Sequence, residues 1–592
     1  MAFAILSFLV AVFLPGSVVY GVLEARGRIL ESDFSLSFFI IFSFVISCCV
    51  NFVLIYALVG IGFYTKPIIL VIFACEILAF LYLFKRRILT TLNLPKILQN
   101  GTKMEKILFL ISILMALYFL NYCFKADIFW AWDAVVSWDR WGSEWAQGQF
   151  VLNEGGYSQL YPMLLSLGYV ASEQISSFQG VGVAIYWYFM FVGAVASLFL
   201  LKDNEVFGAN FSNINCFGIA VCTMIYMIFF RWSGEFYVGY VDMPVAMMIL
   251  ISALLLIKAK SIFENAIDSA ISGKNAESSA FLILLLGSFA AGISAEIKQS
   301  GLFWCGIYVI ALIVFFRKIG AKKLFLNFAI IILFLAPWVI IALYKKLILN
   351  VAATNIEYTW HHIYLGKGYL ERFNDAISNY KKFAQLFFAC ILALGIKNRI
   401  FAFLAIAGIA YFVFWGTHLS YDLRNLQGAM PLMMIAISGI VIYYFEVILR
   451  ILPFLYRWVG AIFVIFVIGG LIVAHFTQER TLKNEYKRKM KLGGEATNTL
   501  VLNAYQNYGN KILLTSNQLI AYVPAFDRKY YKLYHFGEHI KDGQFESDAL
   551  TLKANEGSFY ILLPNKEYAR YKAFLKDAKY IGASEHYTMI EF

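Results

Sequence analysis

The stretch SLSFFIIFSFVISCCVNFVLIYALVGIG (residues 35–62) contains no Asp, Glu, Lys or Arg. A helix needs about 20 consecutive, mostly apolar residues to cross the hydrocarbon core of a bilayer. The segment therefore predicts a membrane-spanning helix, and it indicates what kind of fold to expect from the rest of the chain.

The whole chain shares this character. Of its 592 residues, 61% are hydrophobic, 18% aromatic and only 15% charged, and the mean hydropathy is +0.70. Soluble domains are closer to half apolar and a quarter charged. This composition excludes a soluble cytosolic enzyme, a disordered protein and a collagen-like repeat. It predicts a mainly α-helical, polytopic membrane protein.

Apolar stretches along the chain, this one included, predict fourteen spanning helices. They lie near residues 3–23, 35–62, 67–84, 107–124, 181–201, 213–230, 237–257, 281–295, 301–316, 324–343, 383–396, 400–416, 429–448 and 455–475. The first one lacks the basic region and the small-residue cleavage site of a signal peptide, which favours a retained helix.

Charged residues become about twice as frequent after Phe476, which predicts a separate domain at 477–592. KILLTSNQLIAYV (511–523) and SFYILLPN (558–565) are typical of short buried strands. KEYARYKAFLKDA (566–578) is typical of an amphipathic helix. We expect a small extracytoplasmic α/β domain here, preceded by N-terminal helices and a basic loop at 1–106 and a membrane core at 107–476.

Lys and Arg residues predict the orientation, because cytoplasmic loops carry an excess of them. The chain has two basic groups between predicted helices, one between the third and fourth helices and one at 317–323. If successive helices cross the membrane in alternating directions and 125–180 stays outside the cell, both groups lie on the cytoplasmic side. YPMLLSLGYV (161–170) is then an in-plane or re-entrant segment. The outer segments are 125–180, 231–240, 296–300, 344–382, 417–427 and the region after 476.

The net charge of +12 is explained by these basic loops and does not indicate nucleic-acid binding. The outer loop 344–382 is nevertheless basic. That charge either contradicts the topology or marks an anion-binding loop, and we favour the anion, with Arg372 among its contacts. His361 and His362 in the same loop do not suggest a metal site, because adjacent side chains point in different directions.

The segment AWDAVVSWDRWGSEWAQGQF (131–150) has the highest density of side chains that could act in catalysis or binding. On a helix, Asp133 and Glu144 share one stripe, and Trp138 belongs to a neighbouring stripe of tryptophans. We expect the rings to face lipid and the carboxylates a cavity. A plain aromatic belt also explains the tryptophans. Asp133 follows a spanning helix among apolar residues, where an ionised group is costly unless it is used.

Three further segments carry charge at outer helix ends. Asp242 opens a spanning helix, either as an N-cap or as a second acid in the cavity. Lys298, in AEIKQSGLFW (295–304), either snorkels to headgroups or holds a phosphate. Arg424, near His418 in GTHLSYDLRNLQGAMPLMM (416–434), either pairs with Asp422 or grips a phosphate. No GxxxxGK[ST], GxGxxG, HExxH or CxxC motif is present, so nucleotide, zinc-protease and disulfide chemistry have no support.

Four segments together resemble a known superfamily. WDAVVSW with the downstream YPMLLSLGY, GYVDMPVAMM, KQSGLFW and LRNLQGAMPLMM are similar to the membrane-embedded GT-C glycosyltransferases. The nearest likeness is to bacterial relatives of the protein mannosyltransferases and lipid A aminoarabinose transferases. The resemblance spans about residues 107–475. The chain departs from the family pattern in two places, with Ala after Asp133 where relatives pair Asp with Glu, and with Arg424–Asn425 where relatives often have Arg-Tyr.

The resemblance implies a fold, an activity and a set of roles. We expect a GT-C-like enzyme of the bacterial inner membrane that moves a sugar from a polyprenyl-phosphate donor to an extracytoplasmic lipid, glycan or protein. Asp133 matches the first-loop acid that acts as base, and Asp242 a second acid. Arg424 and Lys298 would hold phosphate, and Trp138 and Tyr161 would stack on sugar or prenyl chain. No cofactor is implied, although a divalent cation is compatible with the family.

A transporter or flippase of lipid-linked sugars is the competing class, because fourteen helices also suit such proteins. A flippase needs charges midway along its helices. Here the selected acids and bases lie at predicted outer helix ends, with Glu76 as an exception. A structural scaffold, the third class, predicts that the acids and bases do not converge.

Overall fold

The computed structural model describes residues 2–27, 36–91, 134–151, 157–172, 240–268, 273–348, 367–395, 399–420, 422–452, 454, 495–516, 531–533 and 543–592. Within these ranges, eight helices are long and apolar enough to cross a membrane. The chain is therefore an integral membrane protein, as its composition predicts. The helices predicted at 107–124, 181–201, 213–230 and 455–475 lie outside the described residues.

The N-terminal helices form one packed group. α1 (Ala2–Ala25), α2 (Leu36–Gly60) and α3 (Lys66–Thr91) match the first three predicted spans. α1 and α2 approach closely where Gly16 faces the backbone of Ser43, since a Cβ on Gly16 would lie 2.0 Å from the Ser43 carbonyl oxygen. The Ser17 hydroxyl donates to the Ser43 hydroxyl at 3.0 Å across the same contact. Small residues at membrane helix contacts permit such an approach.

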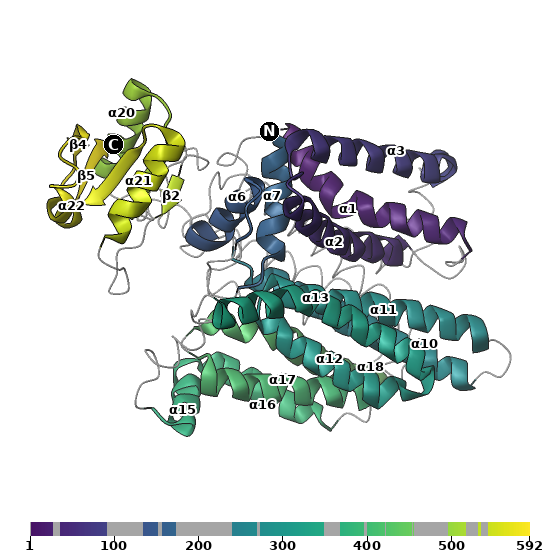
Figure 1. The fold of residues 1–592 in the computed structure, drawn as a ribbon. Helices are drawn as coiled ribbons and strands as arrows, with labels where there is room; N and C mark the ends of the chain where they lie inside the picture. Colours follow the sequence, from purple (N-terminus) through teal and green to yellow (C-terminus); the bar gives the residue numbers. More distant parts are fainter. Residues whose placement is uncertain are drawn as a thin grey trace.

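A second, larger group follows. It consists of α10 (Asp242–Asp268), α11 (Gly273–Ile297), α12 (Ser300–Phe316), α13 (Ala321–Leu347), α16 (Lys381–Ala393), α17 (Arg399–His418) and α18 (Met430–Ile451). The short helices η4 (Arg317–Ile319) and η5 (Leu423–Gly428) lie in its turns. In Figure 1 the two groups, drawn in purple and in teal to green, run in similar directions.

Helix α7 (Leu160–Ser172) connects the two groups. It contacts α1, α2 and α3 on one side and α11 on the other, and Figure 1 shows it running across the direction of the spanning helices. With 13 residues it is too short to span. The Tyr64 hydroxyl lies 2.6 Å from the Ser166 hydroxyl and ties α7 to the turn before α3. The prediction that 161–170 is too short to span is confirmed, and its in-plane or re-entrant position stays a prediction.

Several predicted boundaries are wrong: α3 and α10 also continue past their predicted ends at 84 and 257, to Thr91 and Asp268. α11 begins at Gly273, eight residues before the predicted start at 281, because its polar first turns extend beyond the apolar stretch. α10 begins at Asp242 and not at 237. α16 has 13 residues, fewer than a straight span needs, and α15 (Tyr369–Asn379) is an amphipathic helix that packs on α16 and α17.

The C-terminal residues form the predicted α/β domain. Its five-stranded sheet has the order β2-β1-β3-β5-β4, with β1 (Leu513–Thr515) parallel to β2 (Tyr531–Leu533) and β3 (Tyr560–Pro564). β4 (Lys579–Ala583) and β5 (Tyr587–Glu591) are antiparallel. The helices are α20 (Glu495–Tyr508), α21 (Gln544–Glu556) and α22 (Asn565–Tyr571). The predicted strand SFYILLPN is confirmed as β3, whereas the predicted helix ends early, at Tyr571.

The turn between α11 and α12 provides a test of this packing. A Cβ on Gly301 would lie 2.2 Å from the Ser294 carbonyl oxygen, whereas one on Gly306, on the same helix, would have nothing within 4 Å. Because overpacking costs about 1–3 kcal/mol, we expect Gly301→Ala to lower the thermal unfolding midpoint of the purified protein by several degrees. Gly306→Ala is the matched control, and an equal effect of both variants would contradict this contact.

Candidate functional site

A buried ion pair joins two distant parts of the chain. Asp242 is the first residue of α10, and Lys298 lies in the turn between α11 and α12. Their side chains form a salt bridge and are only 3% and 13% exposed. The Lys298 ammonium also donates to the Asn425 side-chain oxygen at 3.3 Å, which links the pair to η5. Lys298 is therefore held inside the protein and does not snorkel to headgroups.

A second ion pair lies beside the first. Asp422 caps η5 by accepting the backbone N–H of Arg424 at 2.9 Å. The same carboxylate binds the Arg424 guanidinium, with distances to Asp422 Oδ2 of 2.7 Å from Nε and 2.5 Å from one terminal nitrogen. The guanidinium also stacks 4.1 Å from the centre of the Tyr240 ring. The predicted pairing of Arg424 with Asp422 is confirmed.

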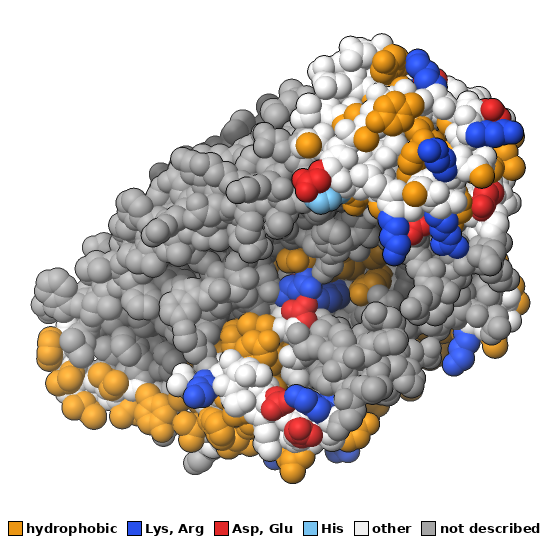
Figure 2. Space-filling view, turned by 90° about the vertical axis from the view of Figure 1, so that its left-hand side faces the viewer, with side chains coloured by type: hydrophobic (Ala, Val, Ile, Leu, Met, Phe, Trp, Pro, Cys, Tyr) orange, Lys and Arg blue, Asp and Glu red, His pale blue; other side chains and the backbone are white. Residues whose placement is uncertain are grey.

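Together these six residues form what we call the charge cluster: Tyr240, Asp242, Lys298, Asp422, Arg424 and Asn425. Its members come from the start of α10, the α11–α12 turn and η5, and these elements contact one another. Of the residues predicted to act, the structure brings Asp242, Lys298 and Arg424 together. Figure 2 looks onto the end of the molecule and shows basic and acidic side chains side by side in a hollow.

Opposite charges in the cluster stabilise each other, and this attraction outweighs the repulsion between Lys298 and Arg424. Burial alone would lower the pKa of Lys298, but the neighbouring Asp242 raises that pKa above its ordinary value. Burial likewise opposes the charge on Arg424, and hydrogen bonding to Asp422 outweighs it, so the pKa of Arg424 is raised. Burial would raise the pKa of Asp422, yet the Arg424 guanidinium holds it below the usual range. Lys298, Asp422 and Arg424 are therefore ionised at neutral pH.

The first outer segment folds differently from the prediction. Asp133 lies outside the described residues. Ala134–Asp139 is a π-helix and Arg140–Ala146 is the short helix α6. A π-helix changes the residue spacing that places side chains on a common face. Trp138, Trp141 and Trp145 are at most 4% exposed, so the expectation that these rings face lipid is wrong.

These rings form part of the core. Trp138 and Trp141 pack on Tyr157, with ring centres 5.6 and 5.5 Å away, and Trp145 packs on Tyr56 at 5.3 Å. Tyr161 is also fully buried. Burial therefore counts against the prediction that Trp138 and Tyr161 stack on a substrate.

Glu144 forms an ion pair within α6. It pairs with Arg140 at 3.5 Å, one turn earlier, and its side chain is 33% exposed. Partial burial raises the pKa of Glu144, while Arg140 acts in the opposite direction.

His418 and Arg372 belong to a separate group. The His418 ring stacks 4.9 Å from Phe414 and 5.1 Å from Tyr369. The Arg372 guanidinium lies 5.3 Å from the same Tyr369 ring and donates to the Lys367 carbonyl oxygen at 2.9 Å. These contacts tie α15 to the end of α17. They place Arg372 and His418 beside each other, not beside the Asp242–Lys298 pair.

Sequence reasoning missed two buried acids. Asp139 is fully buried and accepts a hydrogen bond from the Tyr169 hydroxyl at 2.6 Å. Glu296, near the end of α11, is 1% exposed. Glu296 lies between Ala295 and Ile297, and an acid between apolar residues could have drawn attention to it; Asp139, followed by Arg140, carries no such local signal. Among the described residues, no group of three or more His, Cys, Asp or Glu side chains is placed to hold a metal ion.

Of three comparisons with known proteins, the one with solved structures found matches. No family model matches this chain. No curated protein matches it either. Two crystal structures of ArnT from Cupriavidus metallidurans align over 82% of this chain and 97% of theirs. The one bound to undecaprenyl phosphate has 13% identity and a TM-score of 0.45, and the apo form has 11% and 0.43. A function for this chain must therefore be inferred from its own residues.

The Asp422–Arg424 pair predicts how the stability of the protein depends on pH. Because the pKa of Asp422 is lowered on folding, Asp422 contributes stability that is present above its unfolded pKa, near 4, and is lost as pH falls through its folded pKa. We expect Asp422→Asn to lower the thermal unfolding midpoint by a constant amount between about pH 5 and 8. The difference from the wild type should shrink below about pH 4. A difference that instead grows on acidification would contradict the lowered pKa.

Proposed function

We propose that this protein is an integral-membrane glycosyltransferase. It transfers a sugar from a polyprenyl-phosphate donor to an extracytoplasmic acceptor, which is a lipid, a glycan or a protein. The observation that carries the proposal is the convergence of Lys298 and Arg424 at the ends of membrane helices, beside a buried carboxylate. A purely structural role does not explain this arrangement, because burying charged side chains costs hydration free energy that their partners must compensate.

The two cations suit a phosphate leaving group. Arg presents a planar set of donors that matches two phosphate oxygens, and Lys adds a compact positive charge. Three donors on an ammonium and five on a guanidinium allow both groups to keep their carboxylate partners while binding phosphate. In a poorly hydrated site, fixed cations stabilise developing negative charge strongly and need little rearrangement.

The chemistry follows from these parts. Asp133 acts as the base that removes a proton from the acceptor hydroxyl. The oxygen attacks the anomeric carbon, and the bond from that carbon to the phosphate oxygen breaks in the same displacement, which inverts the configuration. Polyprenyl phosphate leaves with the bonding electrons, stabilised by Lys298 and Arg424. Asp242, held in place by Lys298, orients the sugar or the acceptor.

The donor carries its own leaving group, so the reaction needs no nucleotide. This suits a site on the outer face of a bacterial inner membrane, where we also place the C-terminal α/β domain. We also propose that the chain consists of three parts, which are the N-terminal helices and basic loop at 1–106, the membrane core at 107–476 and the α/β domain at 477–592. Arg372 and His418 lie in the basic outer loop and its neighbouring helix end, where we expect donor or acceptor contacts, as we do for Glu144. No step requires a metal ion.

The cluster residues provide the first test. We expect Lys298→Gln and Arg424→Gln each to reduce transfer by about 100-fold or more, because each removes a cation from the departing phosphate. Lys318→Gln, which alters an exposed lysine of η4 on the predicted cytoplasmic side, is the control. The measurement is transfer of radiolabelled sugar from polyprenyl phosphates in isolated membranes. Wild-type rates in both cluster variants would contradict the phosphate site.

The proposed base provides the second test. Asp133→Asn keeps the shape of the side chain and removes its ability to accept a proton, so we expect transfer to fall to background. The thermal unfolding midpoint of the purified variant, compared with the wild type, establishes that the protein still folds. Undiminished transfer by a folded Asp133→Asn protein would remove Asp133 from the mechanism. The phosphate site would then be tested by the Lys298→Gln and Arg424→Gln variants alone.

A further inference from the structure

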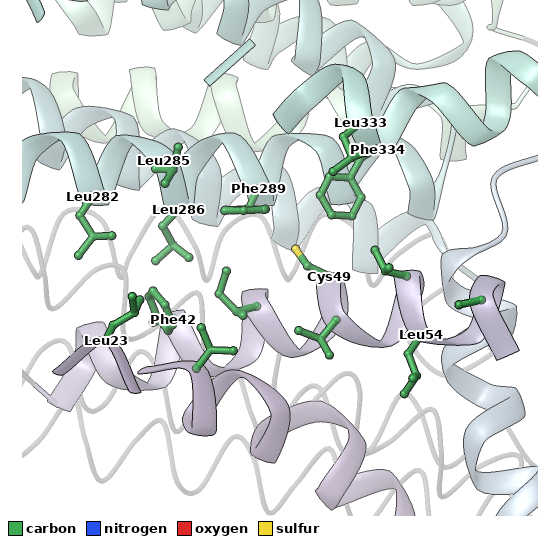
Figure 3. A pocket seen from close by; sticks show the side chains of 15 residues that line it. Leu23, Phe42, Cys49, Leu54, Leu282, Leu285, Leu286, Phe289, Leu333 and Phe334 are labelled. Atoms are coloured by element: carbon green, nitrogen blue, oxygen red, sulfur yellow. The ribbon is translucent and has the colours of Figure 1, made fainter. Parts of the chain in front are cut away.

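An apolar groove separates the two groups of helices. It lies between α1 and α2 on one side and α11 and α13 on the other, and it encloses a cavity of about 610 Å³. Representative lining residues are Leu23, Phe42, Cys49, Leu286, Phe289 and Leu333. Figure 3 shows Leu282 and Leu286 of α11 pointing across the gap toward α2. All of these helices are long and apolar enough to cross the membrane, so the groove lies within the bilayer.

The chemistry of the walls restricts the occupant. Every lining side chain is Val, Leu, Ile, Phe, Ala or Cys. A polar ligand would find no hydrogen-bond partner there, and a buried polar group without a partner is costly. A void would also be unfavourable, because the lining atoms would lose their dispersion contacts. A hydrocarbon chain satisfies both constraints.

One end of the groove is basic. Arg26 directly follows α1, three residues after Leu23, and its backbone N–H continues the helical pattern by donating to the Val22 carbonyl oxygen at 3.1 Å; Glu24 is the acid in the same turn. Lys322 precedes Leu333 by eleven residues, or about three turns, and so lies on the same face of α13. Both basic side chains are exposed. Glu277, the acid at this end of α11, pairs with Lys323 at 2.5 Å. This end is the one predicted to be cytoplasmic, where anionic lipids attract basic residues next to the membrane.

From these observations we propose that the groove binds an acyl chain of an anionic phospholipid, whose headgroup lies near Arg26 and Lys322. The groove and the charge cluster use different parts of α11. Lys298 follows Phe289 by nine residues, which is about two and a half turns, and it points toward α10 and η5. The lipid is therefore a constituent that holds the two helix groups together and is distinct from the sugar donor.

Two pairs of variants test the apolar and the charged ends separately. Leu333 lines the groove and is 58% exposed, so Leu333→Trp fills the groove without overpacking a buried site. Its neighbour Ile332 is 62% exposed and does not line the groove, which makes Ile332→Trp the matched control. At the charged end, the double variant Arg26→Gln, Lys322→Gln is compared with Lys346→Gln, at the opposite end of α13.

The full-length protein is reconstituted in vesicles of phosphatidylcholine and phosphatidylglycerol in equal amounts and extracted in mild detergent. Native mass spectrometry then measures the lipid that each variant retains. We expect the wild type to retain phosphatidylglycerol, and Leu333→Trp to retain about tenfold less. The double variant should lose the preference for phosphatidylglycerol over phosphatidylcholine by about tenfold. Ile332→Trp and Lys346→Gln should match the wild type.

Three results would overturn the proposal. The first is equal retention by Leu333→Trp and Ile332→Trp. The second is an unchanged lipid preference in the double variant. The third is displacement of phosphatidylglycerol by added polyprenyl phosphate, which would assign the groove to the donor. Because lipid retention is measured without sugar transfer, failure of this proposal and failure of the transferase proposal are distinguishable.

Discussion

The ion pair between Asp242 and Lys298 is the constraint on which the rest of the site depends. Two nearly buried charges must satisfy each other, because neither is compensated by water. Their pairing fixes the first turn of α10 against the turn between α11 and α12. Asn425 extends the connection to η5, which carries Arg424. Three separate segments of the chain are thus brought together by one electrostatic requirement, and the proposed phosphate site depends on this convergence.

Helix α11 shows how the scaffold separates two kinds of surface. Its C-terminal end leads into the charge cluster, while its middle turns form one wall of an apolar groove. The short helix α7 braces the arrangement, because it contacts α1, α2, α3 and α11. Among the described residues, the charge cluster lies at helix ends, whereas the groove between the two helix groups is lined by apolar side chains alone. This distribution fits an enzyme that acts at the membrane boundary better than a protein that carries polar cargo through the bilayer.

Patterns within a short stretch of chain were predictable, and contacts between distant stretches were not. The apolar run of α2 predicted a span correctly, and the closeness of Asp422 to Arg424 in sequence made their pairing one of the two alternatives considered for Arg424. Asp242 and Lys298 were each singled out, but nothing local indicates that residues 56 positions apart pair with each other. The tryptophan rings were placed on the wrong surface because a π-helix replaced the assumed α-helix and because tertiary packing buried them. The start of α11 was missed because its polar first turns lie beyond the apolar stretch.

The most direct test of the central claim is an experimental structure of the full chain in a lipid nanodisc with a polyprenyl phosphate added. The account predicts that the phosphate lies within hydrogen-bond distance, about 3 Å, of both the Lys298 ammonium and the Arg424 guanidinium, with the Asp133 carboxylate facing the same space. A phosphate bound elsewhere, with the Asp242–Lys298 and Asp422–Arg424 pairs undisturbed and without a ligand, would contradict it.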